Sequence, residues 1–112
     1  MTNRLEIKLW LAHRLTGMAL GLFVIIHLIT MIVVIQGGLS AAEIMERTSS
    51  NILVVIFYGL FVIAAAIHGS LGLRTVAQEV LSWRGSSLNF VILVFFALLC
   101  VLGMVAIKGL VL

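Results

Sequence analysis

Two histidines stand out because they lie deep inside long apolar stretches. His27 lies within residues 15–35 and His68 within residues 52–73, and neither stretch contains Asp, Glu, Lys or Arg. An imidazole in hydrocarbon has no water to hydrogen bond, so burying it unpaired is costly. Ionisable residues inside a membrane therefore indicate function by default. The chemistries open to them are proton transfer, substrate binding and metal ligation, and the alternative is an interhelical hydrogen bond alone.

Metal ligation fits the surroundings of these histidines better than proton transfer does. A proton relay or transporter usually adds an acidic residue inside a span, and the apolar stretches here hold none. A neutral imidazole needs no counter-charge to bind heme iron, and histidine is a common axial ligand of heme. The residues therefore favour heme ligation by His27 and His68.

The elements that carry the histidines are membrane helices. The chain has 112 residues, of which 63% are hydrophobic and 10% charged, whereas soluble domains carry roughly 25% charged residues. A span needs about 20 apolar residues, and three stretches qualify, at about 9–35, 52–73 and 88–107. These features predict an all-α integral membrane protein, a single anchor domain over residues 1–112 with three transmembrane helices. The net charge of +3 does not suggest nucleic acid, because the basic residues flank the spans.

The loops indicate an orientation. The first loop, residues 36–51, has Ser40 and Glu43 in the spacing that caps a short interfacial helix beginning near Ala41. The second loop is expected at residues 74–87. Five Lys and Arg residues fall on the side of the N-terminus and the second loop, and two on the other side. This bias predicts a cytoplasmic N-terminus in the inner (cytoplasmic) membrane.

The two histidines are expected at different depths. His27 follows Arg14 by 13 residues, about 20 Å of helix, and His68 precedes Arg74 by six residues, about 9 Å. They are therefore poorly placed to bind one iron together. Because no other histidine is buried, each requires a partner histidine from another chain. The chain then forms half of a four-helix bundle that holds two hemes.

Small and aromatic residues share the helix faces of the histidines. Ala64 and Gly72 lie about one turn either side of His68, where they leave room for a porphyrin or allow close helix packing. Phe57 and Phe61, on the same face, are expected at the porphyrin edge. On the first span, a stripe with His27 also carries His13, Thr16 and Thr30, and Gly17 and Gly21 beside it indicate a helix contact.

At this point the chain resembles a known family. The sequence His13-Arg14-Leu15-Thr16-Gly17, followed by His27, resembles the first-helix signature of the cytochrome b membrane-anchor subunits of succinate dehydrogenase and fumarate reductase, the complex II family. The sequence from His68 to Arg74, HGSLGLR, resembles the second-helix motif of that family, a heme-ligating histidine followed by xxxGxR. Three helices with a basic second loop fit its two-subunit anchors.

The resemblance implies heme ligands at both histidines. By this likeness His68 is an axial ligand of the heme nearer the cytoplasm. His27 has no counterpart in single-heme members and matches a ligand of the distal heme in two-heme members. The cofactors implied are therefore two b-type hemes shared with a second membrane anchor subunit.

The resemblance also implies roles for residues near the inner surface. Arg14 would lie near a quinone headgroup or a heme propionate, His13 and Thr16 would line the same quinone pocket, and Arg74 would pair with a propionate. The chain departs from single-heme anchors at Trp10, which stands where they have a quinone-binding serine. An inner quinone site of the usual kind is therefore open to question, and the outer face is the alternative.

The resulting hypothesis is a subunit that passes electrons between an iron–sulfur subunit and membrane quinone. Succinate or fumarate chemistry would belong to a separate flavoprotein, because the chain has no Gly-rich dinucleotide fingerprint and one cysteine, Cys100, which cannot hold an iron–sulfur cluster. Two alternatives remain open. One is a heme-free anchor or assembly subunit. The other is the cytochrome b subunit of another quinone-linked respiratory enzyme, although such chains usually have more spans and histidines.

Overall fold

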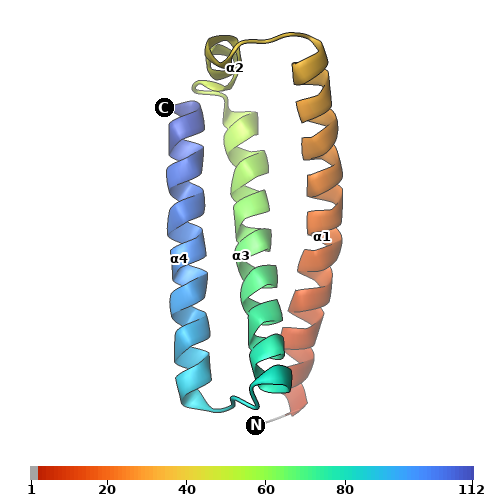
Figure 1. Ribbon diagram of the computed structural model, residues 1–112, viewed down its shortest axis with the longest axis vertical. Helices are drawn as coiled ribbons and strands as arrows, with labels where there is room; N and C mark the ends of the chain where they lie inside the picture. The colour runs from red at the N-terminus through yellow and green to blue at the C-terminus, as the bar shows by residue number, and fades with distance from the viewer. Residues whose placement is uncertain (1–2) are drawn as a thin grey trace.

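The chain folds into α-helices that are long and apolar enough to cross a bilayer. The computed structural model describes residues 3–112, in which no strand occurs and the helices are α1 (Asn3–Gln36), α2 (Ala41–Thr48), α3 (Ile52–Val80) and α4 (Ser86–Val111) (Figure 1). Each of α1, α3 and α4 has the length and composition of a membrane span, and α2 is a short helix between the first two. The prediction of an all-α membrane protein with three transmembrane helices is therefore confirmed.

The three long helices form a row rather than a closed bundle. Helix α3 lies between α1 and α4 and packs against both (Figure 1). The molecule is 51 Å long, which exceeds the hydrocarbon thickness of about 30 Å, so the helix ends project beyond the membrane core. We call the end where α1 and α4 begin and α3 stops the N-terminal end, and the opposite end, which carries α2, the C-terminal end.

Small residues bring α3 close to its neighbours. Ala64, Ala66, Ser70 and Ala77 of α3 are buried. In a bilayer the surrounding lipid is as apolar as a leucine side chain, so helices associate through close packing, which small residues permit. Leu88 of α4 is the largest fully buried side chain and packs, together with Ile92 and Trp83, against Ala77.

The second loop is shorter than the sequence predicts. Helix α3 does not end at residue 73 but continues to Val80, so the connection to α4 spans only residues 81–85 and Arg74 lies inside a helix. The prediction was wrong because a charge marks the edge of the hydrocarbon, whereas helical hydrogen bonding continues into water. The chain leaves the helix where Ser82 and Gly85 adopt positive φ angles of 53° and 100°.

The first loop folds as predicted and is fastened to the end of α4. Ser40 caps α2 and forms a reciprocal capping box with Glu43. The Thr48 hydroxyl donates to the Leu110 carbonyl at 2.8 Å, and the Ser50 N–H donates to the carbonyl of Val111 at 3.0 Å. The last carbonyls of a helix lack intrahelical hydrogen-bond donors, and the first loop supplies donors for two of them in α4.

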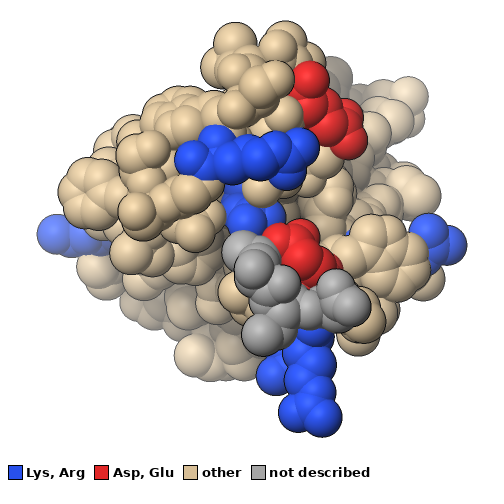
Figure 2. All heavy atoms as spheres, turned by 90° about the horizontal axis from the view of Figure 1, so that it is seen from below, with Lys and Arg blue, Asp and Glu red and all other residues tan. Residues whose placement is uncertain are grey.

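The N-terminal end gathers most of the charged side chains. Viewed onto this end, Figure 2 shows basic side chains spread around the rim with acidic ones between them. The basic residues there are Arg4, Lys8, Arg14, Arg74 and Arg84, and the acidic ones are Glu6 and Glu79. The C-terminal end holds Arg47 and Lys108. The asymmetry of basic residues between the two ends agrees with the sequence count from which orientation was expected.

Because α4 packs against α3, truncating a leucine of α4 should cost more stability at a buried position than at an exposed one. Leu88→Ala removes a side chain that is 1% exposed, whereas Leu98→Ala on the same helix removes one that is 51% exposed. Lipid reduces the transfer term, so we expect the cavity term to dominate and Leu88→Ala to cost about 2 kcal/mol. Thermal unfolding of the purified membrane complex measures the difference. Equal shifts in Tm for the two variants would contradict this packing.

Candidate functional site

His68 faces α1, where the backbone fixes its orientation. Its Nδ1 lies 3.0 Å from the carbonyl oxygen of His13 and 3.5 Å from the Thr16 hydroxyl. The Thr16 hydroxyl donates to the Ala12 carbonyl at 2.6 Å. Because a carbonyl only accepts, Nδ1 of His68 donates the hydrogen, and in the neutral ring Nε2 keeps its lone pair. This tautomer and arrangement are the ones that metal-bound histidines use.

Glycines make the close approach of α1 and α3 possible. A Cβ at Gly17 would lie 2.9 Å from Cε1 of His68, and a Cβ at Gly72 would lie 3.5 Å from Nε2 of His13. At Gly21, one turn from Gly17, a Cβ would meet nothing within 4 Å. Gly17 is therefore the helix contact of the predicted pair, and Gly21 is not. Gly72, one of the two small residues beside His68, serves helix packing.

His13 and His68 lie together at an open hollow near the N-terminal end. Their ring centroids are 4.4 Å apart, with an interplanar angle of 32°. The hollow has a volume of about 480 Å³, and Trp10, Arg14, Gly17 and Met18 complete its lining. The Arg14 guanidinium carbon lies 5.6 Å from the centroid of the Trp10 ring. Rings this close and tilted toward each other leave no room for a heme iron between them, so these two histidines do not form a ligand pair.

Arg74 lies apart from this group. Its Nε donates to Asn89 Oδ1 at 3.2 Å, and its Nη2 is 3.7 Å from a carboxylate oxygen of Glu6. It lines a different cavity, between α1, α3 and α4, which includes neither His13 nor His68. The structure thus brings together His13, Arg14, Thr16 and His68 of the predicted site residues, and leaves Arg74 out.

His27 belongs to a second site, toward the C-terminal end. Its Nδ1 lies 3.1 Å from the Tyr58 hydroxyl, and its ring packs edge-on against Phe61 at 5.9 Å between centroids. Phe57 and Phe61, which share a helix face with His68 and were expected at the edge of a porphyrin, contact the ring of Phe23. His27 borders a pocket of about 700 Å³, whose other polar lining residues are Thr30, Arg47, Thr48, Asn51 and Tyr58.

Tyr58 is the functional candidate that sequence reasoning missed. It is the one tyrosine of the chain and lies inside an apolar span. A buried tyrosine hydroxyl usually has a hydrogen-bond partner, and a histidine on the neighbouring span was an available one. The composition therefore held a signal, but only the packing of α1 against α3 shows which histidine is the partner.

The two histidines mark separate levels of the molecule. His68 contacts α1 at Thr16, and His27 follows Thr16 by 11 residues, about 16 Å along the helix. Within residues 3–112 no group of three or more His, Cys, Asp or Glu side chains is arranged to hold a bare metal ion. A porphyrin supplies its own nitrogen ligands and needs only axial donors from protein. The donor set therefore fits heme iron, which would need its second axial ligand from another chain.

Comparison with known proteins bears on the identity of the chain. No curated protein and no solved structure matches it significantly. A family model described as succinate dehydrogenase/fumarate reductase transmembrane subunit matches residues 1–104. This range includes α1, α2, α3 and all of α4 except its last seven residues, and it contains both His27 and His68. By this match the chain belongs to the succinate dehydrogenase/fumarate reductase transmembrane subunit family.

Proposed function

We propose that this membrane subunit binds heme b and passes electrons between an iron–sulfur subunit and membrane quinone in a succinate:quinone oxidoreductase. The observation that carries the heme assignment is the orientation of His68. Its Nδ1 is held by the His13 carbonyl, which leaves the lone pair of Nε2 free to bind iron, and His68 lines an open hollow. The family match favours complex II over other quinone-linked enzymes with cytochrome b subunits.

The residues around His68 prepare it as a ligand. The bond to the His13 carbonyl fixes the tautomer and rotation of the imidazole and makes Nε2 more basic. Thr16 donates to Ala12 and lies beside His68, so we assign Thr16 to positioning the histidine rather than to quinone. Bound heme would supply one-electron iron chemistry. A second membrane anchor subunit would supply the opposite axial ligand.

Nδ1 of His27 is also held by a hydrogen bond, but its partner is a tyrosine hydroxyl rather than a backbone carbonyl. The Tyr58 hydroxyl accepts from Nδ1 in the tautomer that leaves Nε2 free. The separation of about 16 Å along α1 suits two hemes at two depths, each shared with the second anchor subunit. The chain is then half of a two-heme bundle. Helix α3 lies between α1 and α4 in an open row. The second anchor subunit would pack against a face of this row.

The N-terminal end is the proposed site of contact with the rest of the complex. Its excess of basic residues supports a cytoplasmic N-terminus in the inner membrane, where the iron–sulfur subunit and, behind it, the flavoprotein would lie. The exposed Arg14 and the half-buried His13 line the same hollow and can donate hydrogen bonds to a quinone oxygen there.

A second function is favoured by one observation. Both partly buried imidazoles find hydrogen-bond partners within the chain, the His13 carbonyl and the Tyr58 hydroxyl, which by itself offsets the cost of placing them in hydrocarbon. A heme-free anchor or assembly subunit would show the same bonds. The two functions predict different absorption spectra, because only the heme-binding subunit produces b-type bands.

The decisive test is the reduced-minus-oxidised spectrum of the purified membrane complex. We expect b-type bands in the wild type, and we expect His68→Ala and His27→Ala each to remove a different component, because the two imidazoles serve different irons. Absence of b-type bands from the wild type would leave the heme-free anchor. Loss of the same component in both variants would refute the two-heme arrangement.

The contact of Gly17 with His68 predicts an effect confined to one heme. In Gly17→Ala the new Cβ at 2.9 Å from Cε1 of His68 forces the imidazole to move, at a cost of about 1–3 kcal/mol. We expect the His68 component to weaken or shift in potential while the His27 component stays. Gly21→Ala, whose Cβ meets nothing within 4 Å, is the matched control. A Gly17→Ala complex with both components unchanged contradicts the assignment.

The Tyr58 hydroxyl predicts an effect on the other heme. Tyr58→Phe keeps the ring and removes the hydrogen bond to His27 Nδ1, which is worth about 0.5–1.5 kcal/mol. We expect a shift of about 20–60 mV in the midpoint potential of the His27 component in a redox titration. The His68 component serves as the internal reference. A shift in the midpoint potential of the His68 component alone would contradict the assignment of Tyr58 to the His27 heme.

A further inference from the structure

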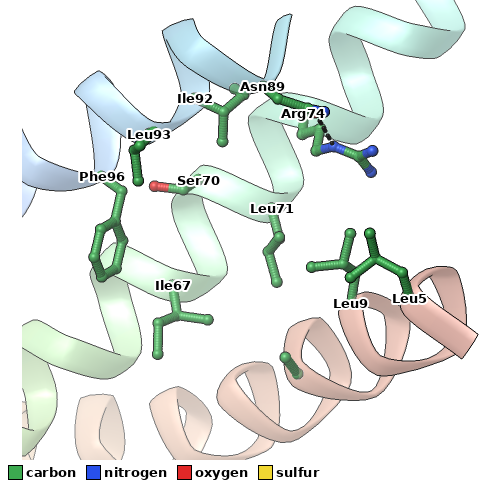
Figure 3. A pocket seen from close by; sticks show the side chains of 11 residues that line it. Leu5, Leu9, Ile67, Ser70, Leu71, Arg74, Asn89, Ile92, Leu93 and Phe96 are labelled. Carbon is green, nitrogen blue, oxygen red and sulfur yellow. Dashed lines mark hydrogen bonds between the residues drawn. The ribbon is translucent and has the colours of Figure 1, made fainter. Parts of the chain in front are cut away.

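A groove between α1, α3 and α4 lies outside both histidine sites. It has a volume of about 380 Å³ and an almost wholly apolar lining, with Leu9 on α1, Leu71 on α3 and Phe96 on α4. Figure 3 shows its side chains converging from the three helices. Its volume lies within the range of small-molecule sites, and nothing in the mechanism proposed above uses it.

One polar atom in the groove has no partner. The side chain of Ser70 is 3% exposed, and its Oγ is the buried side-chain oxygen or nitrogen without a hydrogen bond within residues 3–112. A buried hydroxyl left unpaired costs free energy, and in hydrocarbon water does not compensate. Ser70 lines the groove, so a ligand with a hydrogen-bond acceptor would satisfy it.

A charged pair stands one helical turn from Ser70, at the N-terminal end of the groove. Arg74 is 8% exposed and donates to Asn89 through Nε, the bond drawn in Figure 3. Its Nη2 is 3.7 Å from Glu6, whose side chain is 50% exposed. This contact is longer than a hydrogen bond, and guanidinium has five donors, so donors of Arg74 remain for a ligand. The mouth of the groove presents a cation and an anion side by side.

We propose that the groove binds one membrane phospholipid whose headgroup carries an amine. The phosphate pairs with Arg74, the amine with Glu6, and an ester carbonyl at the glycerol accepts from the Ser70 hydroxyl. One acyl chain lies along Leu71 toward Phe96. This site does not depend on heme, and it lies apart from the hollow that His13 and His68 line.

The order of groups along the groove matches that of a phospholipid. Arg74 lies at the end of the groove nearer the N-terminal end of the molecule, and Ser70 lies four residues deeper, about 6 Å along α3, with only apolar lining beyond it. A phospholipid has its charges outermost, its ester groups just beneath and hydrocarbon below. A quinone carries no charge for Arg74 and Glu6, and an apolar partner helix brings no acceptor for Ser70.

The first test measures lipid retained by the whole complex. We would wash the purified complex extensively in detergent and count bound phospholipid by native mass spectrometry and by extraction. Ser70→Leu fills the groove and should lower the count by one phospholipid per copy of this chain, with the absorption spectrum unchanged. Ser86→Leu, an exposed serine of α4 outside the groove, should retain the wild-type count. An unchanged count in Ser70→Leu overturns the proposal.

A gentler variant keeps the test decisive if Ser70→Leu fails to assemble. Ser70→Ala leaves the groove open and removes only the hydroxyl, so rebinding of phosphatidylethanolamine to the delipidated complex should weaken about threefold to tenfold. Equal affinity in Ser70→Ala and wild type overturns the role of Ser70.

The headgroup preference tests the charged pair. The wild-type complex should retain phosphatidylethanolamine over phosphatidylglycerol by about two- to fivefold. Glu6→Gln should abolish this preference while keeping a bound lipid. A wild-type complex without preference, or a groove filled by a partner subunit in a structure of the complex, overturns the proposal.

Discussion

The contact between α1 and α3 at His68 is the interaction on which the rest of the molecule depends. The His68 ring lies so close to α1 that residue 17 must lack a side chain, and the carbonyl of His13 accepts a hydrogen bond from Nδ1 of His68. The same contact packs the ring of His13 against that of His68 and places Arg14 at the adjoining hollow. One close approach of two helices therefore satisfies a buried imidazole, sets its tautomer and assembles the candidate site.

Helix rigidity extends this contact into a second site. Once α1 is fixed against α3 at Thr16, His27 is placed about 16 Å farther along, where Tyr58 and a group of aromatic rings surround it. In both sites a polar group on the other helix forms a hydrogen bond with Nδ1 of the histidine. If the two hemes proposed above bind, the two levels would suit electron transfer along the membrane normal, because each histidine would serve its own heme.

Helix α3 differs on its two sides in a way that reflects the solvent. Toward its neighbours it presents small buried residues such as Ala64, Ala66 and Ala77, because packing rather than water drives association in lipid. Its buried polar residues, Ser70 and Arg74, line a groove that neither α1 nor α4 fills. An open row of helices leaves surface that lipid and partner chains would cover.

The sequence by itself determined the class of fold and the residues worth attention. Hydropathy specified three spans, the spacing of Ser40 and Glu43 specified the cap of α2, and the isolation of His27 and His68 in hydrocarbon marked them as candidates. These features depend on local chemistry. The end of α3 was misjudged because charge reports the membrane edge and not the helix end.

Only the tertiary structure decided which residues meet. It paired Tyr58 with His27, gave Gly17 rather than Gly21 the helix contact, placed Phe61 against Phe23 and turned Arg74 toward Asn89 and Glu6. Helical periodicity identifies the face on which a residue lies but does not specify which neighbouring helix covers that face. That choice depends on the close approach of α1, α3 and α4, which involves residues far apart in the sequence.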